Sequence, residues 1–187
     1  MTSNAVLSGF TVRNGATRPN TLALYGAGGG VADPSKATVV NCIMTNNAAY
    51  TGGGALLVTL NNCLLIGNIA DFEGGGAYNA TLNNCTVVHN YTTFLGSASG
   101  AGTYNCQVRN SIVCNNFGGG LHSGLTANYS LSSDRFTFSC SDPLPFGTSN
   151  IDAIPVFLDA FHIAASSPFR RTGSPLYASG FDMDGEP

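Results

Sequence analysis

Short groups of apolar residues alternate with glycines and asparagines along this chain, in a pattern that repeats. The clearest copy is GGGAYNATLNNCTVVHN at 74–90. GGGALLVTLNNCLLIGN at 52–68 precedes it, and GAGTYNCQVRNSIVCNN at 100–116 follows it in the same spacing. More degenerate copies run over 28–47 and 6–14. Repetition of this kind predicts a fold built by stacking equivalent units.

Chemically similar residues occupy the same places in successive copies. The matched sets are Leu60, Leu82 and Val108; Cys42, Cys63, Cys85 and Ser111; Met44, Leu65, Val87 and Val113; and Asn47, Asn68, Asn90 and Asn116. Positions 47, 68 and 90 give steps of 21 and 22 residues, too short for a propeller blade or a helical hairpin. Leucine-rich repeats have a similar period, but their leucine spacing is missing here. Because the apolar triplets are rich in β-branched residues, they favour a coil of short parallel strands.

Three bends are expected in each copy. Asn84 and Asn90 should mark two of them, because asparagine tolerates the left-handed backbone conformation. The glycine triplets permit the third, tighter bend. The side chains of four residues in this copy should then point into the interior: Ala77, Leu82, Cys85 and Val87. Asparagines stacked at ~4.8 Å can also form hydrogen bonds from one turn to the next.

The copy GGGAYNATLNNCTVVHN resembles the repeat of bacterial right-handed parallel β-helix proteins, a large group of secreted and surface proteins. Residues 151–187 resemble their closing region, although Ile154-Pro155 stands where an aspartate-proline pair is usual. The expected fold is therefore an all-β, right-handed parallel β-helix with an irregular C-terminal cap. We expect one domain over 1–187, with regular rungs in 1–124 and loop-rich rungs and a cap in 125–187. Lyases, hydrolases, adhesins and carbohydrate-binding modules all use this scaffold, so the resemblance alone does not define a function.

The composition agrees with one long, narrow core. The chain has 187 residues, of which 43% are hydrophobic and only 9% are charged. A net charge of -3 without a basic cluster argues against nucleic acid or an anionic membrane as a partner. No signal peptide is evident and the apolar runs are too short to span a membrane. We expect a module of a larger secreted or cell-surface protein, with the signal peptide outside this chain.

Cysteine and histidine positions do not predict a metal site or a cofactor. Three of the six cysteines occupy equivalent rungs and should form a buried thiol stack: Cys42, Cys63 and Cys85. The sequence leaves open whether Cys140 forms a disulfide with one of the other cysteines. There is no CxxC pair, and the histidines are dispersed. Asp182 and Asp184 resemble the start of a calcium loop, but its later glutamate cannot be checked in this sequence.

Aromatic residues recur in the connections between copies, at 15–27, 48–51, 69–73, 91–99 and 117. They are Tyr25, Tyr50, Phe72, Tyr91, Phe94 and Phe117. If the rungs are in register, these rings form a strip along the coil axis, with Asp71 and Glu73 beside it. Aromatic faces bind the apolar faces of sugar rings, and carboxylates accept sugar hydroxyl protons. The strip is thus a candidate carbohydrate-binding site, although the rings could instead pack over the glycine bends.

The residues that come after each cysteine cannot all face inward, so one sheet should also carry apolar side chains on its outer face. The candidates for covering it are the tail around 136–146, a neighbouring domain and a self-contact. Residues 156–158 and 161–163 are expected to be strands of a final rung.

Catalysis by the lyases and hydrolases of this architecture needs clustered carboxylates. The first 124 residues contain only three acids, Asp33, Asp71 and Glu73, and no opposing pair. A non-catalytic carbohydrate-binding module is therefore favoured, and the resemblance implies attachment to a glycoside hydrolase and a xylan-like plant β-glycan as ligand. The alternatives are a structural or adhesive segment of a surface protein, and a pectate-lyase-like or hydrolytic enzyme. An ice-binding face is not favoured, because no array of outward threonines is evident.

Overall fold

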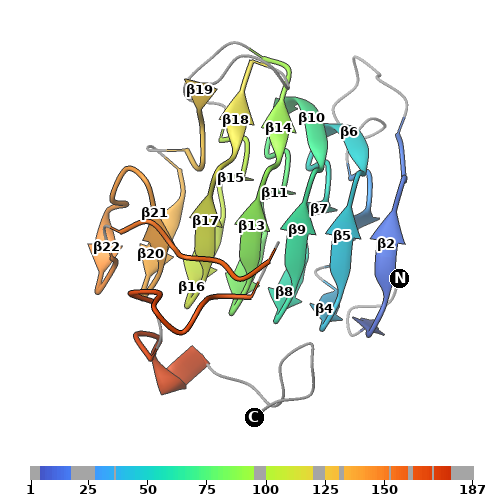
Figure 1. Ribbon diagram of the computed structural model, residues 1–187. Coiled ribbons are helices and arrows are strands. Elements are labelled where there is room, and N and C mark those ends of the chain that lie inside the picture. Colours follow the sequence, from blue (N-terminus) through green and yellow to red (C-terminus); the bar gives the residue numbers. More distant parts are fainter. Residues whose placement is uncertain are drawn as a thin grey trace.

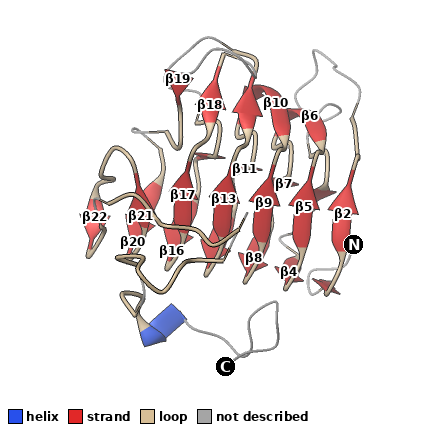
Figure 2. Cartoon of the chain, in the orientation of Figure 1, coloured by secondary structure: helices blue, strands red, loops and turns tan. Residues whose placement is uncertain are grey.

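The computed structural model describes residues 5–17, 28–35, 37–94, 100–119, 125–130, 133–151, 153–159, 162–169 and 171–177. These residues form short strands that stack into four sheets (Figures 1 and 2). The described part contains no α-helix and a single 3-10 turn, η1 (Pro175–Tyr177). Tyr25, Asp182 and Asp184 lie outside the described residues, so the structure does not test the predictions made for them.

Each sheet collects the equivalent strand of successive turns. Sheet A contains β1 (Val6–Ser8), β4 (Thr38–Val40), β8 (Thr59–Asn61), β12 (Thr81–Asn83), β16 (Gln107–Arg109), β20 (Arg135–Thr137) and β22 (Gly147–Thr148). Sheet B contains β2 (Thr11–Arg13), β5 (Ile43–Thr45), β9 (Leu64–Ile66), β13 (Thr86–Val88), β17 (Ile112–Cys114) and β21 (Cys140–Ser141). Sheet C contains β6 (Ala48–Thr51), β10 (Ile69–Glu73), β14 (Tyr91–Thr92), β18 (Phe117–Gly118) and β19 (Leu125–Thr126). Sheet D contains β3 (Val31–Ala32), β7 (Ala55–Leu56), β11 (Ala77–Tyr78) and β15 (Thr103–Tyr104).

Neighbouring strands are parallel and in the register that the repeat predicts. Leu82 pairs with Leu60 on one side and with Val108 on the other. Only β19 breaks the rule among the named strands, because it pairs with β18 in the antiparallel sense. The molecule is therefore an all-β parallel solenoid of about four turns. The predicted fold class is confirmed.

Left-handed residues turn the chain at the corners. Asn84 has a φ of 53°, as predicted, but the second predicted bend is displaced by one residue. There His89, with a φ of 53°, adopts the left-handed conformation, and Asn90 does not. The side chain of Asn90 instead points inward and is fully buried. Assigning Asn90 to the bend itself was wrong, because its amide is needed inside the coil.

The glycine corner depends on the absence of side chains. Gly74 has a φ of 64°, and its equivalent Gly52 has a φ of 65°. A Cβ added to Gly75 would lie only 2.2 Å from the carbonyl oxygen of Tyr91 and 2.6 Å from that of Ala101. At Gly75 the neighbouring turns thus leave no room for a side chain, whereas the next turn carries Ala101 at the equivalent position.

An apolar column and a polar column fill the interior. The apolar part includes Leu60, Leu82 and Val108 from sheet A and Met44, Leu65, Val87 and Val113 from sheet B. The predicted thiol stack is confirmed, since Cys42, Cys63 and Cys85 are buried in this same cluster. All six cysteines lie in the described residues, and none of them forms a disulfide. The possible bond from Cys140 is therefore not present.

The outer face of sheet B is apolar, as predicted, and part of the same chain covers it. Leu64, Val88 and Cys114 are buried there, and Phe157 packs against them. Figure 1 shows the orange-red segment after β22 passing across β17 and β13. Of the three candidates for the cover, the tail around 136–146 was the wrong segment of the chain, because Phe136 pairs with Val108 and joins the interior.

The covering segment also differs from its predicted strands. Phe157 and Ile163 form an isolated antiparallel bridge with each other, so they belong to a small hairpin and not to a parallel final rung. Two side-chain amides of the coil bind the backbone near η1: Asn84 Nδ2 donates to the carbonyl of Tyr177 at 2.6 Å, and Asn110 Nδ2 donates to that of Ser174 at 2.7 Å. The residues in which the repeat is lost therefore no longer form turns of the coil but cover its outer surface.

Candidate functional site

The outer face of sheet C holds most of the predicted strip. Ala49, Ala70 and Thr92 are the inward residues of β6, β10 and β14, and all three are buried. Because side chains alternate along a strand, their neighbours point outward. Tyr50 and Tyr91 occupy such outward positions, and the aromatic rings near sheet C form two separate groups.

The first group is a ladder of Tyr50, Phe72 and Phe94. The rings of Tyr50 and Phe72 are 5.9 Å apart between centroids and only 6° from parallel. Phe94 meets Phe72 at 4.8 Å with its ring turned by 62°. Exposure is greatest at the two ends, where Tyr50 retains 36% and Phe94 48% of its surface. Phe72 lies between them and is half-buried, so the ring surface open to a ligand belongs mainly to the ends of this ladder.

A bulge in β10 creates the contact between Tyr50 and Phe72. Ala70 pairs with Ala49, and Glu73 pairs with Thr51, so two residues of β10 face the single residue Tyr50. The extra residue lets Phe72 stack on Tyr50 although the strands differ in length. Their equal spacing from the glycine triplets predicted this alignment.

Tyr91 and Phe117 form the second group. They pair in register, with ring centroids 5.9 Å apart and planes 26° from parallel. The same outward column continues through Ile69, which pairs with Tyr91. The expected single strip is thus two columns, one containing Tyr50, Phe72 and Phe94 and the other containing Tyr91 and Phe117.

The two predicted carboxylates have different surroundings. Asp71 is exposed, and the Thr93 hydroxyl donates to its backbone carbonyl at 2.9 Å. Glu73 instead accepts a hydrogen bond from Tyr104, on sheet D. Partial burial raises the pKa of Glu73, and the Tyr104 hydroxyl opposes that rise. Of these two carboxylates, Asp71 is the exposed acceptor beside the first ladder.

A further ring pair, on sheet D, was missed from the sequence. Tyr78 and Tyr104 on sheet D stack with centroids 5.5 Å apart and planes within 3° of parallel. Burial raises the pKa of both phenols, and the Glu73 charge adds to the effect. The signal was visible, because both tyrosines end the same part of the repeat, GGGAY and GAGTY.

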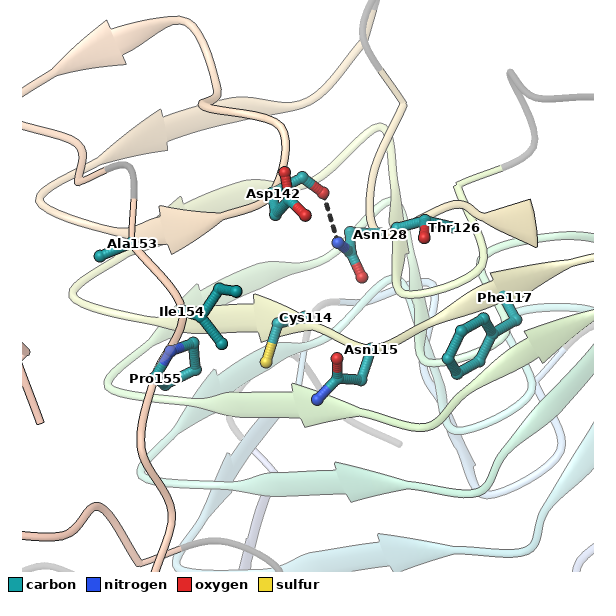
Figure 3. Close-up of a pocket in the computed structure, with 9 residues that line it drawn as sticks. All are labelled: Cys114, Asn115, Phe117, Thr126, Asn128, Asp142, Ala153, Ile154 and Pro155. Carbon is teal, nitrogen blue, oxygen red and sulfur yellow. Dashed lines mark hydrogen bonds between the residues drawn. The ribbon is translucent and has the colours of Figure 1, made fainter. Parts of the chain in front are cut away.

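Figure 3 shows a small pocket between the coil and the covering segment. Cys114, Asn115 and Phe117 face Ile154 and Pro155 across it, and Asn128 Nδ2 donates to the backbone carbonyl of Asp142. Its volume of ≈ 80 Å³ holds a few water molecules, whereas ligand pockets usually measure about 300–1,000 Å³. This pocket is a packing gap, and the open face of sheet C is the better candidate for a large ligand.

Metal-binding and membrane-spanning features are not found in the described part of the chain. No three histidine, cysteine, aspartate or glutamate residues come together there as a metal site would need. No helix in these ranges has the length and apolarity to cross a membrane.

The fold places the protein in the class of parallel β-solenoids. Comparison with protein-family models, curated proteins and solved structures finds no match to the chain. The case for function therefore rests on the surfaces of sheets C and D and their ring pairs.

Proposed function

We propose that the protein is a non-catalytic carbohydrate-binding module that binds an extended polysaccharide along the outer face of sheet C. The observation that carries the proposal is the ladder of Tyr50, Phe72 and Phe94, whose rings are in contact across consecutive turns and exposed at both ends. Sugar rings present apolar C–H faces that pack on aromatic rings, and their hydroxyls need polar partners nearby. Asp71 on β10 and Thr93, which directly follows β14, provide such partners.

The shape of the site favours a long, neutral chain over a small molecule. The aromatic contacts run from turn to turn along the solenoid, so a ligand can meet several rings in sequence. A xylan-like β-glycan of plant cell walls is the first candidate, from the resemblance of the repeat. We further propose that this module belongs to a larger secreted or surface protein with a linked catalytic domain.

Absence of catalysis is part of the proposal. Of the two predicted carboxylates beside the first ladder, Asp71 stays exposed, whereas Glu73 is engaged by Tyr104. Hydrolysis of a glycosidic bond normally needs two carboxyl groups that face each other across it. Reducing-sugar release or unsaturated products from xylan, pectin or glucan, lost in an Asp71→Ala, Glu73→Ala double variant, would contradict this and favour the enzyme alternative.

The test is calorimetric titration of the full chain with xylo-oligosaccharides. By analogy with other ring-stacking surfaces, Tyr50→Ala and Phe94→Ala should each weaken binding by about 1–3 kcal/mol. Phe146→Ala is the matched control, because Phe146 is 84% exposed but lies outside sheet C. Equal affinity in all three folded variants would reject the ladder as the site. No binding of any glycan by the wild type would favour the structural or adhesive alternative, in which the rings only pack on one another.

A further inference from the structure

The outer face of sheet A differs from the other faces because it is almost wholly polar. Its outward positions on β4, β8, β12, β16 and β20 are Thr38, Val40, Thr59, Asn61, Thr81, Asn83, Gln107, Arg109, Arg135 and Thr137. Contrary to the expectation from the sequence, three threonines do share one outward column, but Gln107 and Arg135 continue it. These ten positions include two arginines and no carboxylate.

A groove of ≈ 310 Å³ lies between this face and the corner that leads to it from sheet D. Its volume reaches the lower end of the range for ligand sites, unlike that of the pocket in Figure 3. Ala80 and Cys106 are buried at its base. The polar side chains that line it are Asn79, Thr81, Asn105, Gln107, Ser133 and Arg135.

The fold fixes the position of each of these groups. Thr81, Gln107 and Arg135 pair in register on consecutive strands, so they lie one after another at the strand spacing of ~4.8 Å. Asn79 and Asn105 occupy the left-handed corner just before, and the amide of Asn105 donates to that of Asn79. The donors and acceptors thus lie on rigid elements, as a binding site requires.

Arg135 is a cation without a counter-ion among the described residues. Its side chain is exposed, and the ion pair found among the described residues joins His162 to Asp159 and leaves Arg135 out. The carboxylate next to it in sequence, Asp134, turns inward and accepts from the backbone N–H groups of Cys106 and Ser130 and from the Thr103 hydroxyl. A planar guanidinium binds carboxylate and sulfate groups in bidentate fashion.

Two tyrosines come directly before lining residues of the groove in the sequence. Tyr78 and Tyr104 immediately precede Asn79 and Asn105 and stack on each other. Phenol rings, amides and hydroxyls are the groups with which proteins bind sugars, whereas a site for a simple inorganic anion needs no rings.

We propose that this groove is a second binding site and that its ligand is an anionic sugar unit, whose carboxylate or sulfate group binds Arg135. Asn79, Asn105 and Gln107 hold the sugar hydroxyls. This site is separate from the ladder on sheet C and does not depend on it, because all of its lining residues come from sheet A and the adjoining corner.

The experiment is calorimetric titration of the full chain with a uronate oligosaccharide, a sulfated oligosaccharide of equal length, a neutral one and sodium sulfate. At least one acidic oligosaccharide should bind. Comparing the titrations with the uronate and the sulfated oligosaccharide shows whether the protein prefers a carboxylate or a sulfate group. Arg135→Gln should weaken this binding by at least about tenfold, the effect of one charge-assisted hydrogen bond. Arg13→Gln, which removes an exposed arginine from sheet B, should leave it within about twofold.

Added salt should also weaken the interaction, because a charge pair with an exposed group is screened. The proposal is overturned if neither acidic oligosaccharide binds, if the neutral one binds as tightly, or if Arg135→Gln binds as the wild type does. Equal binding of sodium sulfate alone would define a simple anion site and overturn it as well.

Discussion

Asn47, Asn68, Asn90 and Asn116 form a ladder of buried, hydrogen-bonded side chains inside the coil. Replacing Asn90 by alanine should therefore lower the free energy of unfolding strongly. The Asn90 Oδ1 atom accepts from the backbone N–H of Asn68 at 3.0 Å and from its Nδ2 at 2.9 Å. The Asn90 Nδ2 atom donates to the carbonyls of Leu65 and Val88 and to Asn116 Oδ1, at 2.9 to 3.1 Å. Every one of these groups is buried, so no solvent replaces the lost partner.

Removal of the Asn90 amide leaves two buried donors of Asn68 without an acceptor. An unsatisfied buried donor costs about 1–3 kcal/mol, so the free energy of unfolding should fall by about 2–6 kcal/mol. The matched control is Asn61→Ala on the outer face, where Asn61 Oδ1 accepts a single hydrogen bond from Asn83 at 2.8 Å in a partly exposed place. There the loss should be below about 1 kcal/mol, because water can take the place of the acceptor.

Urea unfolding followed by circular dichroism measures both variants against the wild type. Similar midpoints for Asn90→Ala and Asn61→Ala, at similar slopes, would show that the inner ladder is not what holds adjacent turns together. A loss of stability confined to Asn90→Ala would support the role of the inner ladder. If water binds in the space left by the amide, the loss should lie at the lower end of the range.

Three further perturbations test other parts of the structure. Leu82→Ala removes a fully buried core side chain and should cost about 2–5 kcal/mol on urea unfolding; a loss below ~1 kcal/mol would mean that the site repacks. Gly75→Ala should destabilise strongly or prevent folding, because its Cβ would lie 2.2 Å from a carbonyl oxygen, and a near-native melting temperature would contradict that geometry. Desolvation raises the pKa of Asp134 from 3.8 to about 6, so the folded state holds its proton more tightly than the unfolded state. Stability from this group should be present below pH ~4 and decline by up to about 3 kcal/mol as the pH rises past 6, and Asp134→Asn should remove that part of the pH dependence.

The regular turns could be predicted because each position of the repeat has one environment. A leucine at 60 and 82 and a valine at 108 share one column, and the structure pairs them in that register. Prediction failed where the repeat length changes. Phe136 comes 28 positions after Val108 and was not recognised as the next member of its column, so it was assigned to the cover.

The candidate site was predictable only in part for the same reason. Tyr50 and Phe72 stack as their spacing implied, whereas the engagement of Glu73 by Tyr104 joins strands of different sheets. Arg135 reaches the groove through a long turn that the repeat does not describe. Contacts between unlike parts of neighbouring turns leave no periodic signal in a sequence.

The covering segment changes how this solenoid should come apart. In a plain coil each turn touches only the turns before and after it, so stability is nearly a sum of neighbour terms and unfolding can proceed from an end. Phe157 packs on a cluster whose members, Leu64, Val88 and Cys114, come from three consecutive turns. A single segment therefore links those turns directly, and they should open as one cooperative block, while the turns outside it fray first. Hydrogen exchange would reveal this as a common protection level over β9, β13 and β17.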